Sequence, residues 1–205
     1  MVERIFLVRH AETLVNQKKV LRGSETRHDV LSERGQAQAR ACAAAFAALN
    51  LADPRVYAST YTRAQQTARA IADALRVEPT VVEGLQEMDI GAWFGRPYGD
   101  LDTHVHELLG QDGSVGFPAG ESCAEVAGRT RAALDLVLSR GGTPIVVSHG
   151  LAIQTLLCDL LGENVAEAWQ DRRYLHQNTG VTELIRRGGQ WEPARIGCVR
   201  HLPRD

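Results

Sequence analysis

Two basic side chains stand next to each other where the first apolar run of the chain ends. The strand-forming residues 5–8 are followed at once by Arg9 and His10. A neutral imidazole is a nucleophile near pH 7, and a guanidinium can bind two oxygens of a phosphate group at once. The pair is therefore either a solvated strand end or a place where a nucleophile and a cation meet an anionic group.

Arg63 and His149 repeat this pattern later in the chain. His149 lies in PIVVSHGLAIQTLL, between a strand-like run and an apolar helix, and Arg63 lies in the first turn of a helix for which Ser59 or Thr60 is the expected cap. The positive end of a helix dipole disfavours a protonated imidazole, whereas an anion bound there reverses that preference. Taken singly, His149 is more typical of a core or capping histidine, and Arg63 of a solvated arginine.

Strand-like and helix-like segments alternate around these residues. Such alternation predicts an α/β fold of three layers, α/β/α, with a mostly parallel central sheet. The expected strands are residues 5–8, 55–58, 80–82, 144–148 and 181–185, and the expected helices are residues 32–49 (with Ser32 as the N-cap), 61–75, 121–138 and 151–161.

A parallel sheet changes the interpretation of the four basic side chains. The carboxyl ends of parallel strands share one edge, and three such ends carry Arg9, His10, Arg63 and His149. We therefore expect two arginines and two histidines to converge on a pocket for a dianion such as a phosphoryl group.

The composition is that of an ordinary globular protein. The 205 residues fit one domain, covering 1–205, and their formal net charge of −2 argues against nucleic-acid and membrane-surface binding. The N-terminus does not match a signal peptide and no apolar stretch is long enough to span a membrane, so we expect a cytoplasmic protein. The oligomeric state is left open, with a homodimer as one option. The cysteines, which lack metal-ligand spacing and are expected to be free buried thiols, are Cys42, Cys123, Cys158 and Cys198.

The segment from Gly91 to Glu121 interrupts the alternating pattern. It is rich in glycine and also contains the aromatic residues Trp93, Phe94, Tyr98 and Phe117. In an α/β protein an excursion of this kind often lies over the carboxyl edge of the sheet, where ligands bind. We therefore expect a lid-like insertion at about 91–121; a long surface connection without function is the alternative.

Four segments occur in an order that is typical of a known family. They are LVRHAETLVN (7–16), STYTRAQQTA (59–68), LQEMDIGAWFG (85–95) and VVSHG (146–150). The set resembles the histidine phosphatase superfamily, which includes the phosphoglycerate mutases and many phosphomonoesterases. NTGVTELI at 178–185 is similar to the late core strand of that family. The resemblance implies a phosphoglycerate mutase-like fold.

The resemblance also implies a mechanism that uses no metal and no other cofactor. His10 would be the nucleophile that becomes phosphorylated. The residues implied to bind the phosphoryl group or the rest of the substrate are Arg9, Arg63, His149, Asn16 and Gly150.

Glu87 matches the proton donor of the family. It would give a proton to the leaving alkoxide and then take one from the water that cleaves the phosphohistidine. Asp89, two residues on, is the alternative proton donor. Glu121, in FPAGES, is interpreted as structural, beside a helix cap at Ser122 or Gly120. The histidines without a motif, which are expected to be solvated, are His104, His106, His176 and His201.

Departures from the family pattern bear on the substrate. Ala11 replaces the common glycine of R-H-G-E-T, so we expect this turn to use an ordinary backbone conformation. Arg22, followed by Gly23, stands where relatives often have threonine or glutamine. It either binds a second anionic group of the substrate or is solvated. Phe94 replaces a glutamate and makes the expected pocket rim more apolar.

These observations lead to three hypotheses about function. The first is a metal-independent phosphomonoester phosphatase that acts through a phosphohistidine, with a small phosphorylated metabolite as its partner. The alternative is a cofactor-dependent phosphoglycerate mutase, although the 91–121 region resembles the phosphatase version. The third is a domain that binds a phosphorylated ligand without catalysis, which the intact His10, Arg63, Glu87 and His149 disfavour.

Overall fold

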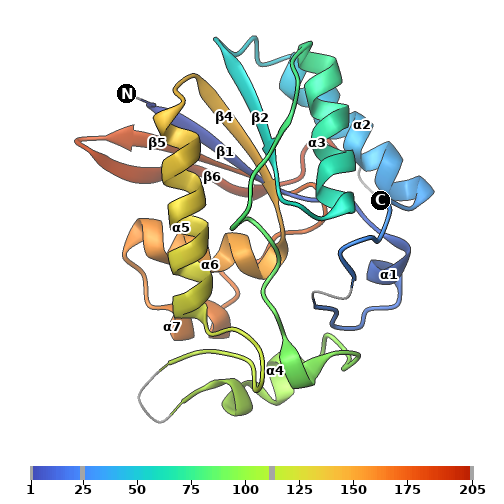
Figure 1. The fold of residues 1–205 in the computed structure, drawn as a ribbon, viewed down its shortest axis with the longest axis vertical. Helices are drawn as coiled ribbons and strands as arrows, with labels where there is room; N and C mark the ends of the chain where they lie inside the picture. Colours follow the sequence, from blue (N-terminus) through green and yellow to red (C-terminus); the bar gives the residue numbers. More distant parts are fainter. Residues whose placement is uncertain (1, 24–25, 111–113, 204–205) are drawn as a thin grey trace.

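A six-stranded mixed sheet lies at the centre of the computed structural model, which describes residues 2–23, 26–110 and 114–203 (Figure 1). The strand order is β3-β2-β4-β1-β5-β6. The bounds are β1 Arg4–Arg9, β2 Pro54–Ala58, β3 Thr80–Val81, β4 Thr143–Ser148, β5 Val181–Arg187 and β6 Gln190–Cys198.

Strand β1 lies inside the sheet, parallel to β4 on one side and antiparallel to β5 on the other. Strand β2 is parallel to both β3 and β4. Because β1, β2 and β4 run in the same direction, their carboxyl ends at Arg9, Ala58 and Ser148 meet at one edge, and Arg9 is in register with Ser148. The predicted mostly parallel sheet is confirmed, with β5 and β6 as its antiparallel part.

Helices cover both faces of the sheet, which confirms the three-layer prediction (Figure 1). They are α2 (Glu33–Ala47) and α3 (Thr62–Leu75) on one face, and α5 (Cys123–Ser139) and α6 (Gly150–Leu161) on the other. Successive residues of β1 point to opposite faces, so Phe6 packs with α2 and α3 while Leu7 packs with α5 and α6. Burial of a side chain of this size contributes roughly 1.5–3 kcal/mol to stability.

Two of the expected helix caps are confirmed and one is wrong. Ser32 accepts a hydrogen bond from the N–H of Gly35 as the N-cap of α2, and Ser122 caps α5. Helix α3 instead begins after Tyr61, without a side-chain cap. The Ser59 hydroxyl, which we expected to cap this helix, lies beside a histidine of the sheet edge.

The insertion at 91–121 extends beyond the sheet, toward the foot of Figure 1. It contains two short 3₁₀ turns (Gly91–Trp93 and Val105–Leu108) and helix α4 (Asp100–Thr103). Trp93 and Phe117 pack edge to face in a separate apolar cluster, with ring centroids 5.4 Å apart. Backbone hydrogen bonds join residues 95–98 to residues 19–21, so the insertion is tied to the loop that follows β1.

Three elements were not predicted from the sequence: α1 (Leu14–Gln17), α7 (Val165–Gln170) and β6. Cys42, Cys123 and Cys158 are free and buried as expected, whereas Cys198 on β6 is free and partly exposed, so the expectation of burial was wrong there. Among the described residues, no helix is both long and apolar enough to cross a membrane.

Candidate active site

His10 lies directly after β1, and only 3% of its surface is exposed. Its Nδ1 is 2.7 Å from the carbonyl oxygen of Ala11, and its Nε2 is 3.0 Å from Nε of Arg63. A carbonyl accepts and a guanidinium donates, so these two bonds place the proton on Nδ1 and leave Nε2 unprotonated, with its lone pair accepting from Arg63. Nε2 is therefore the nitrogen with which His10 can attack. The φ of Ala11 is not positive, as expected for an alanine in this turn.

The surroundings of His10 keep its imidazole neutral. Burial, followed by the charges of Arg63 and Arg9, holds the pKa of His10 well below its usual value near 6.5. A neutral imidazole keeps the Nε2 lone pair available at mildly acidic pH. The same two arginines give the site positive charge for an anion.

Arg63 is buried in the first turn of α3, as the sequence indicated. One of its terminal nitrogens donates to the carbonyl oxygen of Thr26 at 2.8 Å, and its guanidinium carbon lies 4.9 Å from the ring centroid of Tyr61. These contacts hold the guanidinium beside His10. The alternative of a solvated surface arginine does not hold for Arg63.

Arg9 reaches the same edge from the end of β1. Its Nη1 donates to the carbonyl oxygen of His176, while its Nε is buried and has no hydrogen-bond partner among the described residues. The Arg9 side chain packs against Gly150, where an added Cβ would lie at contact distance, 3.5 Å, from Nε. The expectation that His176 is solvated was wrong. It is buried between Tyr174 and Thr182, and burial lowers its pKa to about 4.

His149 is fully buried at the start of α6, with its ring centroid 5.2 Å from that of His10. Its Nε2 is 2.6 Å from the hydroxyl of Ser59, and this hydroxyl already accepts a hydrogen bond from the N–H of Tyr61. Among the described residues the hydroxyl proton has no acceptor other than Nε2, so we assign it to this bond, which leaves the proton of His149 on Nδ1. This Nδ1 has no partner in the described part of the chain. Burial and the nearby charge of Arg63 lower the pKa of His149 well below its usual value.

Glu87 lies at the N-terminus of α6, in the coil between β3 and the insertion. Its carboxylate accepts hydrogen bonds from the backbone N–H groups of Met88 (2.9 Å), Ala152 (3.0 Å) and Leu151 (3.4 Å). It is one of the residues that line the cleft, whereas Asp89 is turned to the N–H of Gly91. Because Glu87 lines the cleft and Asp89 is not among the described lining residues, the structure favours Glu87 over Asp89 as the proton donor.

Asn16 belongs to a small amide network that sequence analysis found only in part. Its Nδ2 donates to the hydroxyl of Tyr98 at 3.3 Å, and its Oδ1 accepts from Asn178 at 3.3 Å. Asn178 also donates to the backbone oxygen of His10 at 3.0 Å. Asn178 is the first residue of NTGVTELI, just before β5. That segment was interpreted only as a core strand, so this asparagine was not predicted as part of the site.

Arg22 and Gly23 lie farther out in the loop after β1. Arg22 lines the cleft, and its guanidinium carbon lies 5.0 Å from the ring centroid of Phe94. Its Nε is buried and has no partner in the described part of the chain. Gly23 is buried, and its carbonyl oxygen accepts from the backbone and the hydroxyl of Thr26. Gly23 is not among the described residues that line the cleft.

A cleft of about 1750 Å³ is lined by Arg9, His10 and Arg63, and it is larger than a phosphate ion requires. Asn16, Arg22 and Glu87 also line it, whereas the fully buried His149 is not among its described lining residues. Besides the sheet-edge residues, the cleft is lined by Tyr98 and Leu101 of the insertion and by residues of the C-terminal segment. No cluster of three or more metal-ligating side chains was found in the described ranges.

Comparison with known proteins agrees with this geometry. The sequence model of the histidine phosphatase superfamily (branch 1) matches residues 5–199, and the chain belongs to that family. A protein of Yersinia enterocolitica named probable phosphoglycerate mutase GpmB is 36% identical over 165 residues, which cover 78% of this chain and 75% of that protein. A protein of the same name from Salmonella paratyphi C is 31% identical over 97% of this chain and 94% of its own length.

Solved structures share the fold over nearly the whole chain. The phosphoserine phosphatase of Entamoeba histolytica in complex with 3-phosphoglyceric acid is 28% identical, with a TM-score of 0.83 over 98% of this chain and 99% of that one. A variant of the same phosphatase in complex with phosphoserine is 27% identical, with the same TM-score and coverage. Family and relatives together make this chain an enzyme of the phosphatase or phosphoglycerate mutase type.

Proposed function

We propose that the chain is a metal-independent phosphomonoester phosphatase that acts on a small phosphorylated metabolite through a phosphohistidine at His10. One observation carries this proposal. The unprotonated Nε2 of a buried, neutral His10 lies at a cleft that Arg9 and Arg63 also line. The ring of His149, whose Nδ1 has no partner among the described residues, lies behind it with its centroid 5.2 Å from that of His10. A nucleophile surrounded by donors and cations is what in-line transfer of a phosphoryl dianion requires.

In the first step, the Nε2 lone pair of His10 forms a bond to phosphorus while the bond from phosphorus to the ester oxygen breaks. Glu87, protonated before the step, gives its proton to the departing alkoxide. Arg9, Arg63 and the Nδ1–H of His149 bind the phosphoryl oxygens and neutralise their charge. The Nδ1–H bond of His10 to the Ala11 carbonyl keeps the ring oriented throughout.

In the second step, water attacks the phosphorus of the phosphohistidine, and Glu87, now ionised, takes a proton from that water. The bond between Nε2 and phosphorus breaks, inorganic phosphate leaves, and the lone pair returns to His10. Glu87 is thereby protonated again, so the cycle closes without an added cofactor. The single-domain organisation proposed for residues 1–205 is consistent with one continuous sheet carrying both steps.

The assay that tests this proposal uses a chromogenic phosphate ester at mildly acidic pH in the presence of a metal chelator. We expect turnover, together with an acid-labile phosphoprotein that is trapped by rapid quenching. In His10→Ala, both signals should be lost, with activity reduced by about 10³-fold or more. Turnover that persists in His10→Ala, or that requires an added metal ion, would contradict the assignment.

A phosphoglycerate mutase is the second candidate, because relatives of that name are 31–36% identical to this chain. A mutase returns the phosphoryl group to a second substrate oxygen instead of to water. Incubation with 3-phosphoglycerate and a bisphosphate primer distinguishes the two. Isomerised product favours the mutase, and release of inorganic phosphate alone favours the phosphatase.

A further inference from the structure

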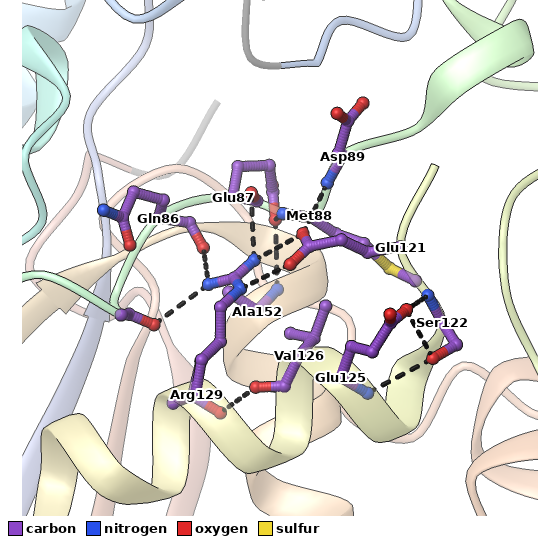
Figure 2. A network of polar contacts seen from close by, with 12 residues as sticks. Gln86, Glu87, Met88, Asp89, Glu121, Ser122, Glu125, Val126, Arg129 and Ala152 are labelled. Atoms are coloured by element: carbon purple, nitrogen blue, oxygen red, sulfur yellow. Dashed lines mark hydrogen bonds and ion pairs between the residues drawn. The ribbon is translucent and has the colours of Figure 1, made fainter. Parts of the chain in front are cut away.

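Arg129 of α5 makes five hydrogen bonds, three to the segment that carries Glu87 and two to Glu121 (Figure 2). Its Nε and Nη2 each donate to the carboxylate of Glu121 at 2.7 Å. Its Nη1 donates to the carbonyl oxygens of Gly84 (2.9 Å) and Gln86 (2.8 Å), and Nη2 also donates to the carbonyl oxygen of Glu87 (3.1 Å). A guanidinium has five N–H groups in a fixed plane, so none is left for another partner.

Glu121 extends this contact to the other side of Glu87. Its Oε2 accepts from the backbone N–H of Asp89 at 2.8 Å, and its own N–H donates to the carbonyl oxygen of Asp89 at 2.9 Å. The two segments approach closely because Gly120 has no side chain, and an added Cβ there would lie 2.4 Å from the Asp89 oxygen. Arg129 and Glu121 together, named here the Arg129–Glu121 clamp, therefore hold the backbone before and after Glu87.

The coil held by the clamp has no regular structure of its own. Residues 82–90 belong to no helix or strand, so helix or sheet hydrogen bonds do not fix where Glu87 points. Instead, Arg129 holds this backbone by hydrogen bonds to the carbonyl groups of residues 84, 86 and 87. From this backbone the Glu87 carboxylate reaches the N–H group of Ala152 (Figure 2). It also accepts from the N–H of Leu151, which lines the cleft together with Glu87.

We propose that Arg129 and Glu121 are positioning residues for Glu87, an inference that rests on the proposed function of Glu87 as the proton donor. Neither residue is among the described residues lining the cleft, so both act through the backbone of Glu87. Proton transfer requires the carboxyl group within hydrogen-bond distance of the ester oxygen, and a displacement of about 1 Å can cost on the order of 10²-fold in rate. Lysine keeps the charge but has only three donors at one point, so it cannot replace Arg129.

The test compares leaving groups in variants of the clamp. Arg129→Lys and Glu121→Gln are assayed on nitrophenyl phosphate, whose leaving group departs without protonation, and on alkyl phosphates, whose leaving group needs a proton. We expect kcat/KM for alkyl phosphates to fall by about 10-fold or more, and for nitrophenyl phosphate to change by less than about threefold. Arg131→Lys is the matched control, because Arg131 lies on the same helix and pairs with Asp159 at an exposed site. It should leave both rates unchanged.

A double variant separates positioning from a structural role. If Arg129 acts through Glu87, adding Arg129→Lys to Glu87→Gln should cause little further loss on alkyl phosphates. An equal loss on every ester, or a multiplicative loss in the double variant, overturns the proposal. If Arg129→Lys does not fold, Glu121→Gln answers the same question with a smaller change. If Glu87→Gln itself lowers kcat/KM, which reports the first step, equally on all esters, Glu87 is not the proton donor and the proposed mechanism fails first.

Discussion

Arg63 donates from Nε to Nε2 of His10 across 3.0 Å, so the resting nucleophile is hydrogen-bonded to a cation proposed to bind the substrate. The lone pair that would attack phosphorus is occupied until an anion enters. In the mechanism we propose, a phosphoryl group that binds Arg63 would replace His10 as the acceptor of this hydrogen bond and so release Nε2. The contact therefore links substrate binding to the freeing of the nucleophile.

Replacing Arg63 with lysine should test this link. Lysine keeps the positive charge but cannot donate in a planar fork, so we expect kcat/KM to fall by about 10² to 10³-fold. Steady-state kinetics with a phosphate ester measures the effect. Arg69→Lys is the matched control on the same helix, because Arg69 forms exposed ion pairs with Asp73 and Glu78. A loss of similar size in both variants would show that the helix, not the guanidinium, is responsible.

Ser59→Ala should weaken phosphate binding through His149. The Ser59 hydroxyl keeps the proton of His149 on Nδ1, and without it the imidazole can place its proton on either nitrogen. We expect the inhibition constant for inorganic phosphate to rise by roughly tenfold. Ser139→Ala, an exposed serine that bonds only to the Leu136 carbonyl among the described residues, serves as the control. Unchanged inhibition in Ser59→Ala would remove this serine from the proposed site.

Arg22→Gln should change which substrates are preferred. Arg22 has a buried Nε that lacks a partner within the described ranges, and it lines the same cleft as the residues proposed to bind the phosphoryl group. A second anionic group of a substrate would reach it there. We expect kcat/KM to fall by about tenfold or more for phosphoserine and 3-phosphoglycerate, and by less than twofold for esters without a second charge. Steady-state kinetics on the two kinds of ester tests this prediction. An equal loss on both would mean that Arg22 only stabilises its loop and does not contact the substrate.

The buried histidines should make the protein less stable in acid. His176 has its pKa lowered to about 4 in the folded state, against about 6.5 when unfolded. Above pH 6.5 both states leave it neutral and no stability is lost. Below that value the unfolded chain binds a proton at His176 while the folded protein does not. The free energy of unfolding therefore falls as the pH drops toward 4, by roughly 3 kcal/mol for this group. The lowered pKa values of His10 and His149 act in the same direction.

Urea unfolding at pH 7 and pH 4 measures that loss. In His176→Gln the difference between the two free energies of unfolding should shrink by about 3 kcal/mol, because glutamine does not titrate. His106→Gln, at an exposed position, should leave the difference unchanged. An unchanged pH dependence in His176→Gln would mean that this histidine is protonated in the folded protein.

The sequence predicted the sheet edge well because its signals are local. Strands β1 and β4 are apolar runs with 0–1% exposure in their centres. His10 and His149 are the residues that directly follow them. Strand β6 gives no such signal. It is mostly exposed, contains Pro193, and pairs with β5 through irregular register. An antiparallel edge strand of this kind does not need the apolar pattern by which strands are recognised.

The residues that the sequence did not reveal act through distant partners. His176 is buried because β5 and the segment before it fold back against β1, a contact between residues more than 160 positions apart. Arg129 looks like an ordinary charged residue on an amphipathic helix. Its role depends on carbonyl groups 42 to 45 positions away, which no local pattern encodes. Sequence periodicity predicts elements, but not which backbone atoms they will meet.

The proposed nucleophile and the groups proposed to act on the rest of the ester lie in parts of the fold that tolerate substitution to different degrees. His10 follows an interior strand that is hydrogen-bonded on both sides, where substitutions are costly. Glu87, Arg22 and the wall of the cleft belong to coil and to the insertion, where changes are tolerated more easily. Evolution can therefore replace the part that selects the ester while it retains the part that holds the phosphoryl group. A single sheet edge can in this way serve many substrates.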